Sequence, residues 1–177
     1  WVSYADSAGA PELRRRIALA SAAADGTVGG APDGSDVVVA NGATEALSLV
    51  FRALLSPGDE VVLEAPTYFA YFRQLAPLGV RIVEIPVGDG GIDLDLLERE
   101  LAARPIKAIL VQPNVQNPTG ATMDDAAKAR LLGLAARSGA ILIQDDVYGD
   151  LHFGPRRPRN LESFGDYDRL VTVSSCS

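Results

Sequence analysis

Short apolar runs alternate with amphipathic segments along most of the chain. Apolar runs typical of buried strands occupy residues 36–40, 60–64, 81–87, 107–112, 141–145 and 170–173. Apolar residues that recur every three or four positions predict helices over residues 11–24, 41–55, 68–78, 93–103 and 124–138. This alternation is typical of parallel βαβ units. The sequence therefore predicts an α/β fold with a mostly parallel sheet and helices on both faces.

Two of the expected strands end abruptly in polar residues. The strand 107–112 leads into a polar loop that contains Asn117, and the strand 141–145 ends in Asp145, with Tyr148 shortly after it. In an open parallel sheet, ligands bind outside the carboxyl ends of the strands. We therefore expect Asn117, Asp145 and Tyr148 to face one crevice. An amide, a carboxylate and a phenol placed there could hold a flat, polar, nitrogen-containing ring.

A turn rich in small residues follows the first apolar run and opens the helix 41–55. Free backbone N–H groups and the helix dipole make such a turn an anion site, although many α/β turns of this kind hold no ligand. Gly42 and Ala43 permit close approach, and Thr44 can add a hydroxyl group. A further candidate, Tyr68, stands just after the strand 60–64. Its ring either packs in the core or stacks on a planar ligand.

Composition and charge restrict the classes of function. Of the 177 residues, 47% are hydrophobic and 22% are charged, which is ordinary for a globular protein with a real core. The formal net charge of -7 argues against a nucleic-acid-binding surface on this segment. No apolar run approaches the roughly 20 residues of a membrane helix. With Cys176 as the single cysteine, no internal disulfide can form, so we expect a reducing, cytoplasmic setting.

Several motifs occur in a fixed order along the chain. They read YADSAGAPELR from Tyr4, NGATEA from Asn41, APTYF from Ala65, QNPTG from Gln116, DDVY from Asp145, and SSCS at the end. Together they resemble the large domain of fold-type-I pyridoxal-phosphate enzymes related to aspartate aminotransferase, and the resemblance covers essentially the whole chain. Residues 145–164 are most similar to the aminotransferase-like domain of MocR-type regulators of the GntR family, which carry a winged-helix DNA-binding domain upstream.

The resemblance implies roles for the strand-end residues around pyridoxal 5'-phosphate. Asp145 matches the aspartate that pairs with the pyridine nitrogen, where an ionised carboxylate keeps the ring protonated and strengthens it as an electron sink. Asn117 and Tyr148 match the residues that hydrogen-bond the ring's 3'-oxygen. Tyr68 matches the aromatic residue stacked on the ring. We expect Asp145 and Tyr148 to be catalytic as well as cofactor-binding.

A second group of residues matches the phosphate site of the family. Ala43 and Thr44 match its backbone and hydroxyl contacts, and Ser175 and Ser177 match hydroxyl groups at the same phosphate. Tyr4 matches a tyrosine that reaches the phosphate of the partner subunit. The resemblance therefore implies a homodimer.

In the family, a lysine follows the serine motif directly and forms a Schiff base with the cofactor. This sequence ends at Ser177, and its lysines, Lys107 and Lys128, stand in other motifs. We therefore assign no Schiff-base residue. Since the sequence begins at Trp1 and ends on an apolar strand, we expect residues 1–177 to be part of the cofactor-binding large domain of a longer protein. A small C-terminal domain and any N-terminal domain would lie outside them.

The main functional hypothesis is a pyridoxal-phosphate-dependent aminotransferase that acts on an amino acid and a 2-oxo acid. An alternative is an effector domain that senses cofactor and amino acid in a MocR/GntR-type regulator. A pyridoxal-phosphate lyase is a third interpretation. A fourth interpretation is a metal- and phosphate-binding α/β domain that uses Asp145 and Asp146, although it leaves Asn117 unexplained. The aminotransferase hypothesis includes no metal site.

Overall fold

The computed structural model describes residues 6–24 and 33–176. In this part of the chain the helices are α1 Pro11–Ala24, α2 Ala43–Leu54, α3 Ala70–Leu75, α4 Leu94–Ala103 and α5 Asp125–Ser138, with 3-10 turns over Ala76–Leu78 and Leu161–Phe164. The strands are β1 Glu60–Ala65, β2 Arg81–Gly88, β3 Gly91–Ile92, β4 Ile106–Val111, β5 Ile141–Asp145 and β6 Leu170–Val173. None of these helices is both long enough and apolar enough to span a membrane.

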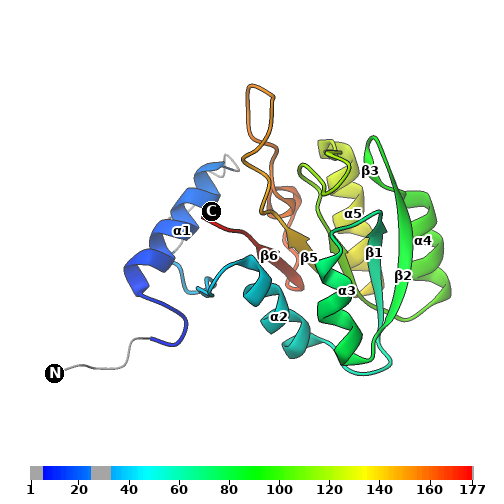
Figure 1. Ribbon diagram of the computed structural model, residues 1–177. Coiled ribbons are helices and arrows are strands. Elements are labelled where there is room, and N and C mark those ends of the chain that lie inside the picture. Colours follow the sequence, from blue (N-terminus) through cyan, green and yellow to red (C-terminus); the bar gives the residue numbers. More distant parts are fainter. Residues whose placement is uncertain (1–5, 25–32, 177) are drawn as a thin grey trace.

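The strands form one six-stranded sheet in the order β3-β2-β1-β4-β5-β6 (Figure 1). Every neighbouring pair is parallel except β2 and β3, which are antiparallel. The prediction of a mostly parallel α/β sheet is therefore confirmed. The short strand β3 was not expected from the sequence, because a two-residue strand directly after the turn 89–90 has no periodic pattern of its own.

The expectation of a strand over residues 36–40 is wrong. Asp36 lies in a turn and residues 37–40 form an irregular connection outside the sheet, in which Val38 is 68% exposed. The Val39 N–H donates to the Ala8 carbonyl at 2.9 Å, but no strand of the described residues pairs with the segment. The run of valines has the right composition for a strand, whereas strand formation also requires a neighbour to complete the ladder.

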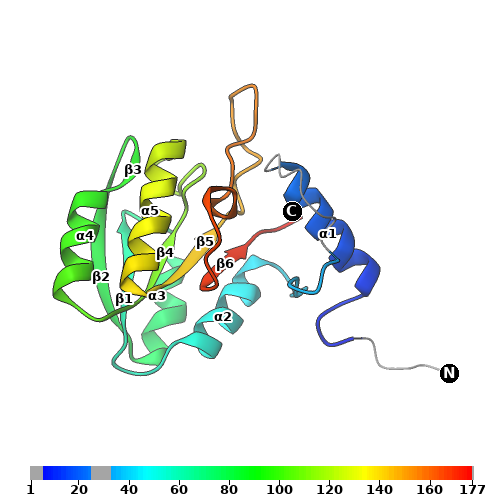
Figure 2. The ribbon, with the colours of Figure 1, turned by 180° about the vertical axis from the view of Figure 1, so that it is seen from behind.

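Helices cover both faces of the sheet, as the sequence predicted. Figure 1 shows α2 and α3 against one face, and Figure 2, from behind, shows α4 and α5 against the other. Side chains of the central strands alternate between these layers, since successive residues of a strand point to opposite faces. Val62, Ile109 and Leu142 pack beneath α4 and α5. Leu63, Leu110 and Ile143 pack beneath α2 and α3.

The parallel arrangement brings the carboxyl ends of β1, β4 and β5 to one edge of the sheet. Val111 is paired with Gln144 in the register of β4 and β5, so Gln112 lies level with Asp145 just beyond the ladder. Likewise, Asp145 is paired with Val173 of β6. Polar residues that are far apart in the sequence therefore meet at this edge.

Helix α5, which supports the sheet next to this edge, begins with a side-chain cap. The Asp124 carboxylate accepts a hydrogen bond from the Ala127 N–H at 2.7 Å. We expect Asp124→Ala to lower the free energy of unfolding by about 1 kcal/mol, because a first-turn N–H group loses its acceptor. Asp124→Asn retains an acceptor and should cost much less. Chemical denaturation of the two variants compares them, and an Asp124→Ala variant as stable as wild type would show that the cap does not stabilise the helix.

Candidate functional site

A pocket opens at the carboxyl edge of the sheet, between α2, α3 and the loops after β4 and β5. It is lined by Ala43, Thr44, Leu47, Tyr68, Gln74, Gln112, Asn117, Asp145, Val147 and Tyr148. The site residues expected from the sequence that line it are Ala43, Thr44, Tyr68, Asn117, Asp145 and Tyr148. Residues from segments spread over more than half of the sequence therefore line one cavity.

The remaining expected residues do not line this pocket in the described part of the chain. Ser175 follows β6 and is half-buried, but it is not among the lining residues. Tyr4 and Ser177 lie outside the described residues.

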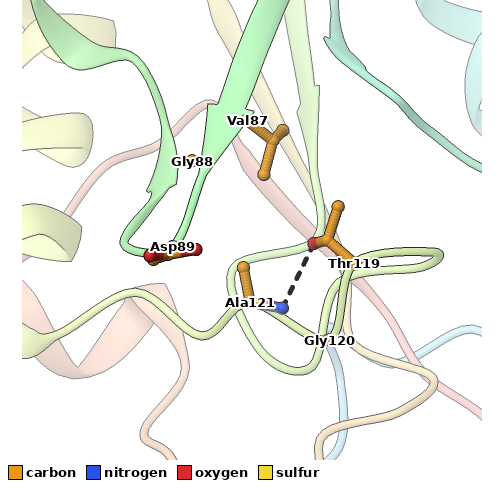
Figure 3. A pocket seen from close by; sticks show the side chains of 6 residues that line it. All are labelled: Val87, Gly88, Asp89, Thr119, Gly120 and Ala121. Carbon is orange, nitrogen blue, oxygen red and sulfur yellow. Dashed lines mark hydrogen bonds between the residues drawn. The ribbon is translucent and has the colours of Figure 1, made fainter.

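A second hollow lies between the turn that joins β2 to β3 and the loop around Gly120 (Figure 3). Backbone and small side chains form most of its wall, and the Thr119 hydroxyl accepts a hydrogen bond from the Ala121 N–H at 3.2 Å. Asp89 is the only ionisable residue that lines it. None of the site residues expected from the sequence is present there, so the candidate functional site is the pocket at Asp145.

Asp145 is the buried acid of the pocket, with 4% of its surface exposed. Tyr71 donates its hydroxyl hydrogen to Oδ2 at 2.6 Å, and the Val147 N–H donates to Oδ1 at 3.1 Å. Burial raises the pKa of Asp145 above its usual range, while these two hydrogen bonds oppose the rise. A carboxylate that is desolvated in this way favours a positively charged partner, because the partner's charge replaces the stabilisation that water would give to the ionised form.

Helix α2 presents its amino end to the same pocket. Its N-cap is Gly42, with φ at 89°, and no side chain caps the first turn. The first N–H groups of a helix have no acceptor within the helix, so they remain available to a ligand. With the Thr44 hydroxyl beside them, these groups suit an anion such as a phosphate.

An aromatic pair on α3 and the residues before it forms another wall. The Tyr68 and Tyr71 rings meet edge to face, with their centroids 5.5 Å apart at 90°. Tyr71 is 1% exposed, whereas Tyr68 is half-buried and lines the pocket. The sequence analysis did not identify Tyr71 as a site residue. Its spacing of three residues from Tyr68 places both rings on one side of a helical turn, and this spacing could have indicated it.

The loop that carries Asn117 is held by glutamine side chains. Gln112 Oε1 accepts a hydrogen bond from the Asn117 N–H at 2.9 Å. Gln116 Oε1 accepts from the Thr119 N–H at 3.0 Å and from the Thr119 hydroxyl at 2.7 Å, and Gln116 Nε2 donates to the Pro66 carbonyl at 2.7 Å. Asn117 is therefore fixed at the pocket wall by its backbone.

Glu64 is a buried acid beneath the pocket that the sequence analysis did not single out. It lies at the end of β1 and is 1% exposed, and its Oε2 accepts the Gln112 N–H at 2.9 Å. Burial raises the pKa of Glu64 to about 8, helped by the nearby Asp145 charge and opposed by hydrogen bonds from Gln112 and Gln116. The only signal in the sequence was its position: Glu64 is a charged residue at the end of the apolar run of β1.

Lys128 and Asp146 belong to a separate polar network behind the pocket. The Lys128 ammonium donates to Asn114 Oδ1 at 2.6 Å and to the Arg159 carbonyl at 2.8 Å. Asn114 Nδ2 donates to Asp146 Oδ1 at 2.8 Å, and Arg157 forms an ion pair with the other oxygen of Asp146. Burial lowers the pKa of Lys128 to about 8. These partners tie α5 to the loop before the turn Leu161–Phe164, away from the pocket lining.

The ion pair of Asp146 bears on the hypothesis of a metal site. The two oxygens of its carboxylate are engaged by Arg157 and Asn114, so Asp145 and Asp146 do not present a free pair of acids. Within residues 6–24 and 33–176, no group of three or more His, Cys, Asp or Glu side chains is arranged to hold a metal ion.

Comparisons with known proteins show the family of this chain. Residues 1–177 match the family described as aminotransferase class I and II. The chain is 38% identical over 143 residues to the uncharacterized HTH-type transcriptional regulator YjiR of Escherichia coli, covering 80% of this chain and 30% of the relative. It is 35% identical over 122 residues to 2-aminoadipate transaminase of Thermus thermophilus, covering 69% of this chain and 31% of that protein.

Solved structures show the same fold. The kynurenine aminotransferase of Pyrococcus horikoshii, in complex with PMP, superposes with a TM-score of 0.89 at 27% identity, over 99% of this chain and 44% of that one. The α-aminoadipate aminotransferase LysN of Thermus thermophilus, complexed with N-(5'-phosphopyridoxyl)-L-leucine, gives 0.87 at 30% identity, over 99% and 43%. The chain thus spans less than half of the length of these relatives.

Proposed function

The chain belongs to the class I and II aminotransferase family, and we propose that the complete protein is a pyridoxal-phosphate-dependent aminotransferase. It would transfer the amino group of an amino acid to a 2-oxo acid. The observation that carries this proposal is the single pocket that gathers Asp145, Asn117, Tyr148 and the amino end of α2. The segment of residues 1–177 would be part of the cofactor-binding large domain.

The residues of the pocket fit this cofactor. The first turn of α2 and the Thr44 hydroxyl suit its phosphate, and Tyr68 offers an aromatic surface to its ring. Asp145, buried and short of a cationic partner, suits a protonated ring nitrogen. Asn117 and Tyr148 line the same pocket and suit the 3'-oxygen. When bound, the cofactor supplies the carbonyl group that takes up the amino group and a ring that withdraws electrons from the substrate carbon.

The chain's own residues then have separate tasks. Asp145, held ionised against its burial by Tyr71 and the Val147 N–H, would keep a proton on the ring nitrogen. Tyr148 and Asn117 would stabilise negative charge on the 3'-oxygen by donating hydrogen bonds. Tyr68 would orient the ring and exclude water from one of its faces.

Further contacts remain proposals that complete this site. Ser175 and Ser177 would add hydroxyl groups at the phosphate, and Tyr4 would reach the phosphate of a partner subunit. A homodimer would then be the working unit. The cytoplasm is the proposed compartment, since a single cysteine is compatible with a reducing environment.

A second candidate function has its own support in the likeness to a helix-turn-helix regulator. In that case the same pocket would bind cofactor and amino acid as the effector site of a MocR/GntR-type regulator. The segment of residues 1–177 carries a net charge of -7 and would not contact DNA itself.

The experiment uses the full-length protein, titrated with pyridoxal phosphate and then supplied with amino acids and 2-oxo acids. We expect a visible absorbance band on binding, and new 2-oxo acid that requires both substrates. Bound cofactor without 2-oxo acid formation, together with DNA binding that responds to an amino acid, would favour the regulator instead. Absence of any cofactor band at saturating pyridoxal phosphate would contradict both candidates.

A further inference from the structure

The Gln116 side chain joins two loops that leave neighbouring strands of the sheet. Gln116 lies in the loop after β4, directly before Asn117, and is 2% exposed. Its Nε2 donates to the Pro66 carbonyl at 2.7 Å and, more distantly, to Glu64 Oε2 at 3.5 Å. Pro66 follows β1 and stands two positions before Tyr68. One buried amide therefore connects the loop of Asn117 to the segment of Tyr68, and both of these residues line the pocket.

The other polar groups of Gln116 close its own loop, residues 116–121. Its backbone N–H donates to the Ala121 carbonyl at 2.8 Å, and its backbone carbonyl accepts the Gly120 N–H at 2.6 Å. Its Oε1 accepts the N–H of Thr119 at 3.0 Å and the hydroxyl group of Thr119 at 2.7 Å. Every polar group of Gln116 thus has a partner. Closure of the loop uses the backbone and Oε1, so Nε2 is left for the contact with the neighbouring loop.

We propose that Gln116 is a positioning residue of the cofactor site: its side-chain amide fixes the loop that presents Asn117 relative to the segment that presents Tyr68. The proposal rests on the function proposed above and deepens it, because Gln116 does not line the pocket and would act only through these two residues. Asn117 would meet the edge of the cofactor ring and Tyr68 its face. A link that holds them at the spacing of a planar ring before the ring arrives lowers the cost of ordering the site on binding.

The first measurement is the affinity of the full-length protein for pyridoxal phosphate. Gln116→Met has a similar volume and removes every side-chain hydrogen bond of Gln116, and we expect the Kd to rise about tenfold. Thr119→Val removes the hydroxyl group that Oε1 accepts but leaves the Thr119 N–H and the bond to Pro66 in place. We therefore expect the Kd of Thr119→Val to stay within about twofold of the wild-type value.

Hydrogen–deuterium exchange of the cofactor-free protein separates a link between the loops from closure of one loop. In Gln116→Met, the amide N–H groups of residues 116–121 and of residues 67–71 should both exchange faster, because the two segments are no longer joined. In Thr119→Val, only residues 116–121 should exchange faster. The visible circular dichroism of bound cofactor, compared at equal occupancy, should fall in Gln116→Met alone, since it reports how the ring is held.

Gln144→Met is the matched control. Gln144 is a fully buried glutamine on β5 whose Oε1 accepts the Leu161 N–H at 2.8 Å, and it does not line the pocket. The substitution should lower the melting temperature, as Gln116→Met also does. It should leave the Kd for the cofactor and the exchange of residues 67–71 unchanged.

The outcomes distinguish the positioning role from the proposed function. If wild type binds the cofactor and Gln116→Met matches it in Kd, or loses affinity without faster exchange of residues 67–71, the positioning role is refuted. Should Gln116→Met fail to fold, Gln116→Asn takes its place, because its amide is one methylene too short to reach both loops. If wild type does not bind the cofactor, the proposed function fails, whereas the exchange experiment still tests the link between the loops.

Discussion

Asp145→Asn is expected to lower kcat/KM of the full-length protein by roughly 10²- to 10⁴-fold, the scale of breaking a buried ion pair. Asparagine fills the same volume and can still accept from Tyr71, whose hydroxyl donates to Asp145 at 2.6 Å. It carries no negative charge, so it cannot keep a proton on a ring nitrogen. The measurements are steady-state kinetics and the affinity for pyridoxal phosphate.

Asp146→Asn is the control for this experiment, because Asp146 adjoins Asp145 in sequence but pairs with Arg157 and Asn114 behind the pocket. We expect it to reduce thermal stability while cofactor affinity and kcat/KM stay close to wild type. Equal losses of activity in both variants would indicate that burial of charge at this strand end matters, and not the position of Asp145 in the pocket.

Glu64→Gln is expected to change how stability depends on pH. Burial raises the pKa of Glu64 to about 8, against an ordinary value of 4.5. Between these values the folded protein binds a proton that the unfolded chain has released. The contribution of Glu64 protonation to the free energy of unfolding is therefore fully present below about pH 4.5 and is lost as the pH rises through about 8. Between pH 4.5 and pH 8 this contribution changes by roughly 3–4 kcal/mol.

Glutamine removes this titration while it still accepts the Gln112 N–H that Glu64 holds at 2.9 Å. Relative to wild type, Glu64→Gln should therefore gain roughly 3–4 kcal/mol of unfolding free energy on going from pH 4.5 to pH 8. Urea denaturation at several pH values, without added cofactor, measures the difference. Glu84→Gln, on the exposed side of the neighbouring strand β2, should leave the slope unchanged. Parallel curves for wild type and Glu64→Gln would refute the prediction.

Much of the fold could be predicted from the sequence because it follows from patterns within short segments. The apolar run of β4, the amphipathic spacing of α5 and the aspartate that caps α5 each act over a few residues. The prediction was wrong for residues 36–40, where the valines suit a strand but no neighbour pairs with them. It missed β3, because a two-residue strand depends on contact with β2 and has no period of its own.

By itself the sequence determined the class of fold and the residues that end the strands around one crevice. Asp145, Asn117 and Tyr148 could be picked out because polar residues after apolar strands meet at the carboxyl edge of a parallel sheet. Ala43 and Thr44 could be picked out because they lie in a turn of small residues that opens a helix. The same rule cannot show which side chains hold those residues in place.

Only the tertiary structure shows which buried side chains hold the site residues in place. The hydrogen bond of Tyr71 to Asp145, that of the Asn117 N–H to the Gln112 side chain, and that of the Gln112 N–H to the buried carboxyl of Glu64 join residues up to 74 positions apart. Sequence patterns report the periodicity of one element and the chemistry of one residue. Hydrogen bonding and burial depend on distances between elements, and these distances exist only once the sheet and its helices have packed.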